Sequence, residues 1–134
     1  MSEMKTRDQI ARLARSIFDR GLTSGSTGNI SVKVDGGWLM TPTGSSFGDL
    51  DPARISKLDE SGAHIGGDKP TKEAFLHTAM YDCRPKAGAV VHLHSTHSVA
   101  VSCLCGVDHS NVLPPLTAYY AMRVGVLPMA AYYP

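Results

Sequence analysis

The sequence has almost no excess of charge of either sign, which narrows the partners that the protein can bind. It contains 13 Lys and Arg residues against 12 Asp and Glu residues, for a formal net charge of +1. Nucleic-acid-binding domains usually carry a basic excess, because lysine and arginine neutralise the phosphates. We therefore expect no nucleic acid among the partners of this protein.

Long apolar runs are also absent from the sequence. No segment approaches the roughly 20 apolar residues that a membrane-spanning helix needs. Residues 1–21 carry a charge every few positions, which is unlike the apolar core of a signal peptide. We expect no membrane partner and a cytoplasmic location.

Cysteine is scarce, and its spacing does not indicate a metal site. The three cysteines are Cys83, Cys103 and Cys105. The last two form a C-L-C pair without the second pair that a zinc knuckle needs. We expect reduced, buried thiols, since cysteine is among the residue types most often found in protein interiors.

What remains is the composition of an ordinary globular protein. Hydrophobic residues make up 43% of the chain and charged residues 19%. A chain of 134 residues is long enough to form one hydrophobic core of its own. No repeat or linker-like tract interrupts it, so we expect a single domain over residues 1–134.

Local patterns in the first half of the chain predict one helix and one hairpin. Apolar side chains at helical spacing, followed by Gly21, predict a helix that runs to about Arg20. Residues 29–34 and 37–41 look like two strands joined by an Asp-Gly turn. The apolar positions of the helix are Ile10, Leu13, Ile17 and Phe18.

The second half of the chain mixes helices and strands as well. Residues 71–83 are predicted to form a helix that Thr71 caps, with Glu73 in its first turn. Residues 87–94 are predicted to form a buried central strand, because their apolar run is continuous. The fold class is therefore α/β or α+β. Two further helices are predicted within residues 96–104 and 116–124.

Three of the six histidines lie in "VVHLHSTHS", residues 90–98, at the end of the predicted strand. Residues two apart on a strand project to the same face, roughly 7 Å apart, so His92 and His94 can bind one metal ion. A hydrogen-bonded structural pair fits the same spacing. The position at the end of a strand favours the metal, because α/β sheets usually bind ligands there. His97 falls on the next helix and is given no role.

Two loops rich in small residues are candidate anion sites. "GSTGNIS", residues 25–31, and "TPTGSS", residues 41–46, allow a ligand close to the backbone, although plain turns fit them equally well. In "KPTKE", residues 69–73, a helix N-terminus near Lys72 favours an anion. Glu73 is also consistent with an ordinary first-turn carboxylate.

The order of these motifs resembles the class II aldolase and adducin head family over nearly the whole chain. The motifs are "STGNIS", "TPTG", a glutamate that opens a helix, and "AVVHLHSTHSVAVS". Within that family, "GDKPTKEAFLH" and "LPPLTAYYAMRVG" resemble the branch of 3-oxo-tetronate 4-phosphate decarboxylases. The resemblance implies a three-layer α/β/α sandwich whose central, mostly antiparallel sheet is flanked by helices.

The resemblance also implies roles for particular residues. His92 and His94 match two zinc ligands, and Glu73 matches the catalytic acid/base, which is also a metal ligand when no substrate is bound. Tyr119, or alternatively Tyr120, matches a tyrosine from the neighbouring subunit of a homotetramer with active sites at its subunit interfaces. The positions that match the substrate-phosphate site are Gly28, Asn29, Thr43, Gly44, Thr71 and Lys72.

The implied activity is that of a zinc-dependent carboxy-lyase, with Mn²⁺ as an alternative ion. It would convert a 3-oxo-tetronate 4-phosphate, a phosphorylated sugar acid, to dihydroxyacetone phosphate and carbon dioxide through a metal-stabilised enediolate. Glu73 or Tyr119 would supply the proton. The alternatives are an aldolase or epimerase acting on a sugar phosphate, and a non-catalytic adducin-like interaction module.

One departure from the family concerns the third metal ligand. The family's third histidine lies in a later strand, in a segment that this sequence does not contain. Catalytic zinc normally has three protein ligands and one open position. We therefore expect the domain to be truncated at its C-terminal side.

Overall fold

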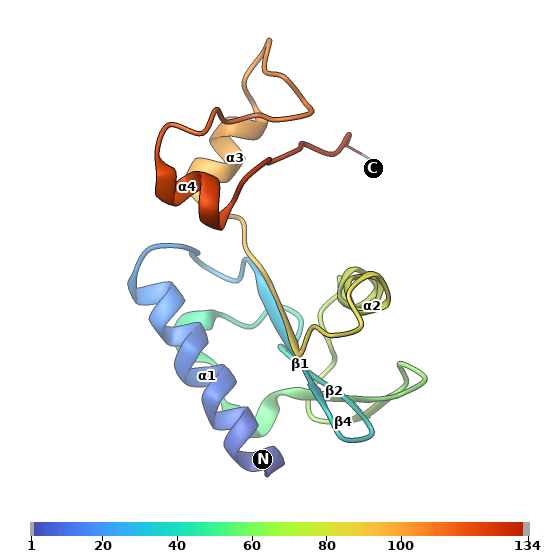
Figure 1. Cartoon of the computed structure of the whole chain (residues 1–134). Coiled ribbons are helices and arrows are strands. Elements are labelled where there is room, and N and C mark those ends of the chain that lie inside the picture. The colour runs from blue at the N-terminus through green and yellow to red at the C-terminus, as the bar shows by residue number, and fades with distance from the viewer. Residues whose placement is uncertain (1, 133–134) are drawn as a thin grey trace. The chain divides into compact units, whose positions relative to one another are not determined.

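We describe the protein from a computed structural model, which defines residues 2–132. The chain divides into two compact units, Met1–Ser95 and Thr96–Pro134 (Figure 1). The expectation of a single domain over residues 1–134 stays a prediction.

The first unit is built around a five-stranded sheet in which every neighbouring pair of strands is antiparallel. Its order is β4-β3-β2-β1-β5. Within the predicted hairpin, Val34 pairs with Gly37 across a turn in which Gly36 has a φ of 76°. That left-handed conformation favours glycine and explains the Asp-Gly signal in the sequence. The strands are β1 (Asn29–Val34), β2 (Gly37–Met40), β3 (Ser56–Asp59), β4 (His64–Gly66) and β5 (Ala89–His92).

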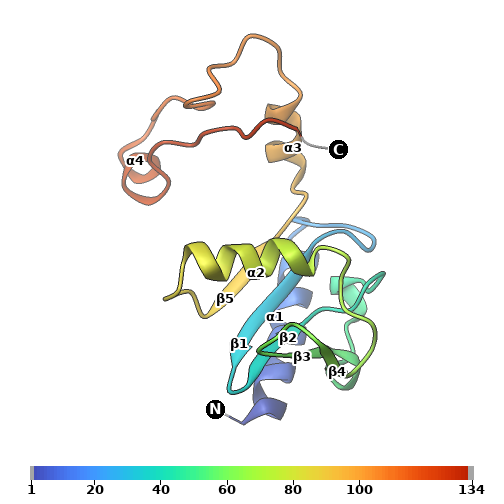
Figure 2. The ribbon, with the colours of Figure 1, turned by 90° about the vertical axis from the view of Figure 1, so that its right-hand side faces the viewer.

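One helix covers each face of this sheet, so the three-layer α/β/α arrangement is confirmed (Figure 2). Helix α1 (Glu3–Asp19) ends where its apolar pattern ends, and α2 (Ala74–Cys83) covers the opposite face. Two short 3-10 helices, Phe47–Asp49 and Pro52–Arg54, lie in the loop between β2 and β3. The core between α1 and the sheet consists of Ile10, Ala14, Ile30, Leu39, Phe47 and Ile55.

Strand β5 differs from its prediction as a buried central strand. It is an edge strand of the sheet formed by residues 2–132, and Val91 is 52% exposed. A continuous apolar run indicates burial on both faces, but it carries no information on how many strands lie beside it. The strand also ends at His92, before the predicted end at His94.

The prediction of buried thiols is wrong. Cys83, Cys103 and Cys105 are all free, as expected, but all three are exposed. Cys83 is the last residue of α2, and the other two follow the next helix in a turn-rich segment. The general tendency of cysteine to be buried does not outweigh these positions near helix ends.

The second unit contains the two short helices that were predicted for it. They are α3 (Thr96–Ser102) and α4 (Ala118–Arg123). Thr117 caps α4, since its hydroxyl accepts a hydrogen bond from the backbone N–H of Tyr120 at 3.1 Å. Across residues 2–132, none of the helices has the length and apolar character needed to cross a membrane.

Candidate functional site

Glu73, His92 and His94 come together in the first unit. One potential ligand atom from each lies within 4.8 Å of the other two. The two imidazole ring centroids are 4.8 Å apart, and Nδ1 of His92 lies 3.1 Å from Oε2 of Glu73. Imidazole nitrogen and carboxylate oxygen are the usual ligands of catalytic zinc. The three residues therefore form a candidate metal site.

The end of β5 positions the two histidines. His92 is the last residue of the strand, and His94 lies in the segment that follows it, so only one of the pair is on the strand. They still approach each other closely. On the neighbouring strand Asn29 pairs with His92, and Gly28 precedes it with a φ of +81°. A Cβ atom on Gly28 would lie 2.9 Å from the carbonyl oxygen of His92, so glycine permits this close approach.

Glu73 lies at the N-cap of α2 instead of in the first turn. The helix begins at Ala74, three residues after Thr71, which does not cap it directly. The N–H of Thr71 donates to the carbonyl of Thr41 at 3.2 Å, and this contact holds Thr71 against the loop that follows β2. The Thr71 hydroxyl accepts from the N–H of Glu73 at 3.3 Å. As a result the carboxylate of Glu73 reaches the histidines.

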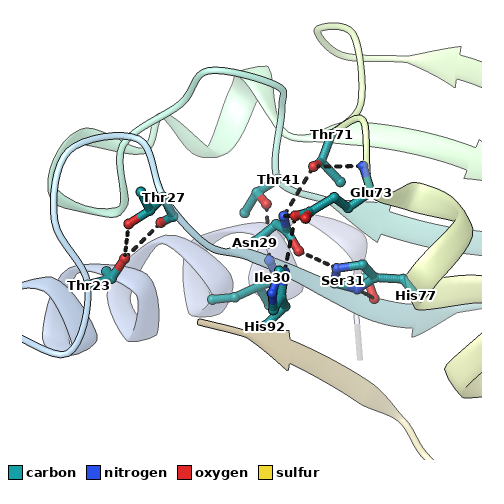
Figure 3. A network of polar contacts seen from close by, with 10 residues as sticks. All are labelled: Thr23, Thr27, Asn29, Ile30, Ser31, Thr41, Thr71, Glu73, His77 and His92. Carbon is teal, nitrogen blue, oxygen red and sulfur yellow. Dashed lines mark hydrogen bonds and ion pairs between the residues drawn. The ribbon is translucent and has the colours of Figure 1, made fainter. Parts of the chain in front are cut away.

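A network of buried polar side chains lies behind the metal site, and Figure 3 shows Asn29, Ser31 and His77 of it. His77 and Tyr81 were missed in the sequence, and Ser31 was considered only as part of the loop of residues 25–31. The Asn29 amide donates to Oε2 of Glu73 at 2.5 Å, and its oxygen lies 2.5 Å from Nε2 of His77. Ser31 Oγ lies 2.7 Å from Nδ1 of His77 and 2.9 Å from the Tyr81 hydroxyl. The available signal was spacing: His77 follows Glu73 by four residues, and Ser31 follows Asn29 by two.

The surroundings of these groups set their charges. Burial acts to raise the pKa of Glu73, but the Asn29 hydrogen bond and the neighbouring His92 outweigh it and lower the pKa overall. Burial lowers the pKa of His77 to about 4, and repulsion from His92 adds to this effect against the attraction of Glu73. At neutral pH the carboxylate is therefore ionised, while the imidazole of His77 is uncharged.

A pocket of about 420 Å³ adjoins the metal site. It brings together all six positions that were predicted for the substrate phosphate. Lys72 is exposed there, and it forms no ion pair with another residue between positions 2 and 132. The lining residues are Ser26, Thr27, Gly28, Asn29, Pro42, Thr43, Gly44, Thr71, Lys72, Glu73 and His94.

A neighbouring pocket of about 310 Å³ also includes Thr43 and Gly44. Its lining also includes Asp49, Asp51 and Asp68. Arg54 lines it too, but its guanidinium is already paired with Asp68 at 2.7 Å. Carboxylates repel a phosphate, so this second pocket is the poorer candidate for an anion.

Two other residues considered in the sequence lie in the second unit. Tyr119 is on α4 and is 70% exposed, with the Arg123 guanidinium 5.6 Å from its ring centre. His97 is on α3, as expected. The role of Tyr119, or of its neighbour Tyr120, stays a prediction.

The chain is similar in sequence and in structure to several known proteins. Over 132 residues the chain is 50% identical to the 3-oxo-tetronate 4-phosphate decarboxylase of Escherichia coli K12, covering 98% of this chain and 62% of that protein. It matches the crystal structure of YgbL from Escherichia coli with a TM-score of 0.92 and 48% identity, covering 98% of this chain and 64% of the other.

A more distant similarity links the chain to an aldolase. It is 42% identical over 100 residues to the L-fuculose phosphate aldolase of Escherichia coli K12, which covers 69% of this chain and 46% of that protein. The chain thus spans less than two thirds of the length of these relatives. The family model of the class II aldolase and adducin N-terminal domain matches residues 8–134. The chain therefore belongs to the class II aldolase and adducin N-terminal domain family.

Proposed function

We propose that the protein is a metal-dependent carbon–carbon lyase that decarboxylates a 3-oxo-tetronate 4-phosphate. The products are dihydroxyacetone phosphate and carbon dioxide. The observation that carries the proposal is the convergence of Glu73, His92 and His94 beside the 420 Å³ pocket. The 50% identity to a decarboxylase of that name supports the choice of substrate.

The donor set fits a divalent cation. Two imidazoles and an ionised carboxylate with ligand atoms within 4.8 Å of one another suit Zn²⁺ and also Mn²⁺. Bound there, the cation supplies a Lewis acid that stabilises the negative charge left when carbon dioxide departs. A third histidine ligand from a later segment, which the family resemblance implies, stays a prediction.

The pocket lining also offers groups that can bind a phosphate. Gly28 and Gly44 leave the backbone accessible, and the hydroxyls of Thr43 and Thr71 can donate hydrogen bonds. Lys72 adds the only ammonium group among the residues that line this pocket. We therefore assign the phosphate to these residues and the 3-oxo end of the substrate to the metal side.

Proton transfer falls to Glu73 in this scheme. Cleavage of the C1–C2 bond leaves an electron pair on C2 as carbon dioxide departs, and a proton must then be added to C2. Glu73 is ionised at neutral pH, so it has to accept a proton before it can deliver one. The phenol of Tyr119, presented by a neighbouring subunit of a homotetramer, is the second candidate donor.

The second candidate function is aldol cleavage of a sugar phosphate. The 42% identity to L-fuculose phosphate aldolase favours it. The same side chains would serve both reactions, because each generates the same negative charge next to a carbonyl and the two differ in the fragment that leaves. An interaction module without activity would have no need for Glu73, His92 and His94 together.

A product assay distinguishes these functions. The intact protein is incubated with Zn²⁺ or Mn²⁺ and 3-oxo-tetronate 4-phosphate, and dihydroxyacetone phosphate and carbon dioxide are both measured. We expect equal amounts of the two products. In Glu73→Gln the rate of product formation should fall by roughly 100-fold or more. Cleavage of L-fuculose 1-phosphate with no release of carbon dioxide would instead identify an aldolase.

A further inference from the structure

We propose that His77 is a positioning residue for the metal site, which holds the Asn29 amide in the one orientation that donates to Glu73. Ser31 and Tyr81 extend this support into the interior. The effect on turnover rests on the proposed function, whereas the orientation itself rests on hydrogen-bond geometry alone.

Two periodicities bring these side chains together. Glu73, His77 and Tyr81 are spaced by four residues from the N-cap along α2, so they lie on one face of the helix. Asn29 and Ser31 are two apart on β1 and lie on the sheet face that this helix covers. The two rows of polar groups interlock behind the metal site.

The direction of the hydrogen bonds follows from the carboxylate. An ionised Glu73 can only accept, so Asn29 must present its NH₂ group, which also donates to the Thr71 hydroxyl at 3.2 Å. The Asn29 oxygen then faces Nε2 of His77 and can only accept as well. The proton of His77 must therefore reside on Nε2.

The positions of the remaining protons in this hydrogen-bond network then follow. With its proton on Nε2, an uncharged His77 accepts at Nδ1, so the Ser31 hydroxyl donates to it. The Ser31 oxygen in turn accepts from the hydroxyl of Tyr81 at 2.9 Å. Each proton of this network therefore has one defined position, and each of its four side chains has a hydrogen-bond partner.

Burial of these side chains makes the loss of any one hydrogen-bond partner costly. His77 and Ser31 are 0% exposed, Tyr81 is 3% exposed and Asn29 is 4% exposed. Water is therefore a poor substitute for a missing partner. Without His77 the Asn29 oxygen has no donor, and the amide is free to turn that oxygen toward Glu73. The carboxylate then loses a hydrogen bond and its fixed position beside His92.

If the network had only a structural role, it would stabilise the packing of α2 on the sheet and would not affect metal affinity. Residues that orient metal ligands behave differently, because their loss typically lowers metal affinity by roughly 10–100-fold. Metal affinity in folded variants therefore distinguishes the two roles.

The experiment uses the intact protein and needs no substrate for its main readouts. Nitrogen NMR of the imidazoles gives the tautomer of His77, and competition with a chelator gives the Kd for Zn²⁺. The variants are His77→Leu, which removes both contacts, and His77→Gln, whose amide N–H can still donate to Asn29. Ser31→Ala is matched by Ser56→Ala, another 0% exposed serine, whose hydroxyl donates to the carbonyl of Asp68 at 2.6 Å.

We expect the Nε2–H tautomer in the wild type and a Kd for Zn²⁺ raised roughly 10–100-fold in His77→Leu. His77→Gln should recover most of the affinity. Ser31→Ala should weaken binding by a smaller factor, and Ser56→Ala should not change it. In variants that turn over substrate, kcat should fall in the same order.

Two results would overturn the inference. One is an Nδ1–H tautomer in the wild type, which needs no variant to measure. The other is an unchanged Zn²⁺ affinity in folded His77→Leu, or in Ser31→Ala if the first variant does not fold. A protein with the expected tautomer and affinities that released no carbon dioxide would refute the decarboxylase assignment alone.

Discussion

Nδ1 of His92 lies 3.1 Å from Oε2 of Glu73, although 19 positions separate the two residues in the chain. The first ends strand β5, and the second precedes helix α2. Their approach brings a carboxylate and an imidazole to the same corner of the sheet, where His94 completes the set.

Loss of either imidazole should abolish metal binding. His92→Ala and His94→Ala each remove one of the three ligand atoms, so we expect the metal content of the purified protein to fall to background. Activity should fall by at least about 100-fold. His97→Ala is the control, since His97 is not one of the three residues whose ligand atoms come together, and this variant should keep its metal content. Elemental analysis makes the comparison, and a metal content retained in both ligand variants would contradict the site.

Lys72 should act on substrate binding more than on catalysis. Its ammonium lines the pocket beside Glu73, and a hydrogen bond to a charged group contributes about 1.5–3 kcal/mol. Lys72→Ala should therefore raise KM by about 10- to 150-fold with a much smaller change in kcat. Lys69→Ala removes an exposed lysine three residues earlier, outside the pocket lining. Equal KM values for the two variants would reject the role of Lys72.

The pH dependence of stability should report the buried imidazole of His77. Its pKa is lowered from 6.5 to about 4 in the folded protein. Below pH 6.5 the unfolded chain binds a proton that the folded one does not, so stability falls as the pH drops to about 4. The loss should be of the order of 3 kcal/mol in the free energy of unfolding.

Urea denaturation of the metal-free protein over that pH range measures this loss. His77→Gln has no group that titrates at this position, so its stability should fall less steeply between pH 6.5 and 4. Parallel curves for the wild type and the variant would show that His77 is already solvated in the folded state.

Gly28 should be needed for the site as well as for its loop. Gly28→Ala places a Cβ 2.9 Å from the His92 carbonyl oxygen, in a backbone with a φ of +81°. Gly25→Ala is a matched control, because Gly25 has a φ of +57° but nothing within 4 Å of its Cβ position. Both variants should lose about 1 kcal/mol of stability through backbone strain, and Gly28→Ala should lose more because of this close contact.

Gly28→Ala alone should also weaken Zn²⁺ binding, because the His92 backbone has to move to accommodate the methyl group. The Kd for Zn²⁺, measured by chelator competition in both variants, provides the test. Similar affinities would mean that the close approach to His92 does not position the imidazole.

Tyr119 is the second candidate proton donor, which we expect a neighbouring subunit to present to the site. Tyr119→Phe removes the candidate proton donor, and we expect kcat to fall by roughly 100-fold with the metal content intact. Tyr120→Phe, the adjacent residue on α4, serves as the comparison. A larger fall in kcat in Tyr120→Phe than in Tyr119→Phe would transfer the role to Tyr120. If kcat in both variants equals that of the wild type, Glu73 is the proton donor. Size-exclusion chromatography should show a tetramer.

The sequence predicted the local elements well, because their signals are local. The spacing of apolar residues defined α1, and the Asp-Gly turn defined the hairpin of β1 and β2. His92 and His94 were expected to lie close together and do so, although the strand on which that expectation rested ends at His92. Each of these features depends on neighbours within a few positions of the chain.

The features that sequence reasoning missed depend on distant partners. His77 is a polar residue within a predicted helix, and only the packing of α2 on β1 shows that it is buried. Thr71 was predicted to cap α2, but a contact with Thr41 keeps it outside the helix. The edge position of β5 likewise depends on which strands lie beside it, which no local pattern encodes.

The alternation of side chains along β1 has a consequence for how this protein tolerates change. Asn29 and Ser31 point toward the layer of α2, while Ile30 and Val32 pack with the core under α1. Inserting or deleting one residue inside this strand would exchange the two sets. The amide and hydroxyl groups would then enter the hydrophobic core, and aliphatic groups would lie behind the metal site. A change in the length of this strand should therefore cost more stability than a substitution at one of its positions.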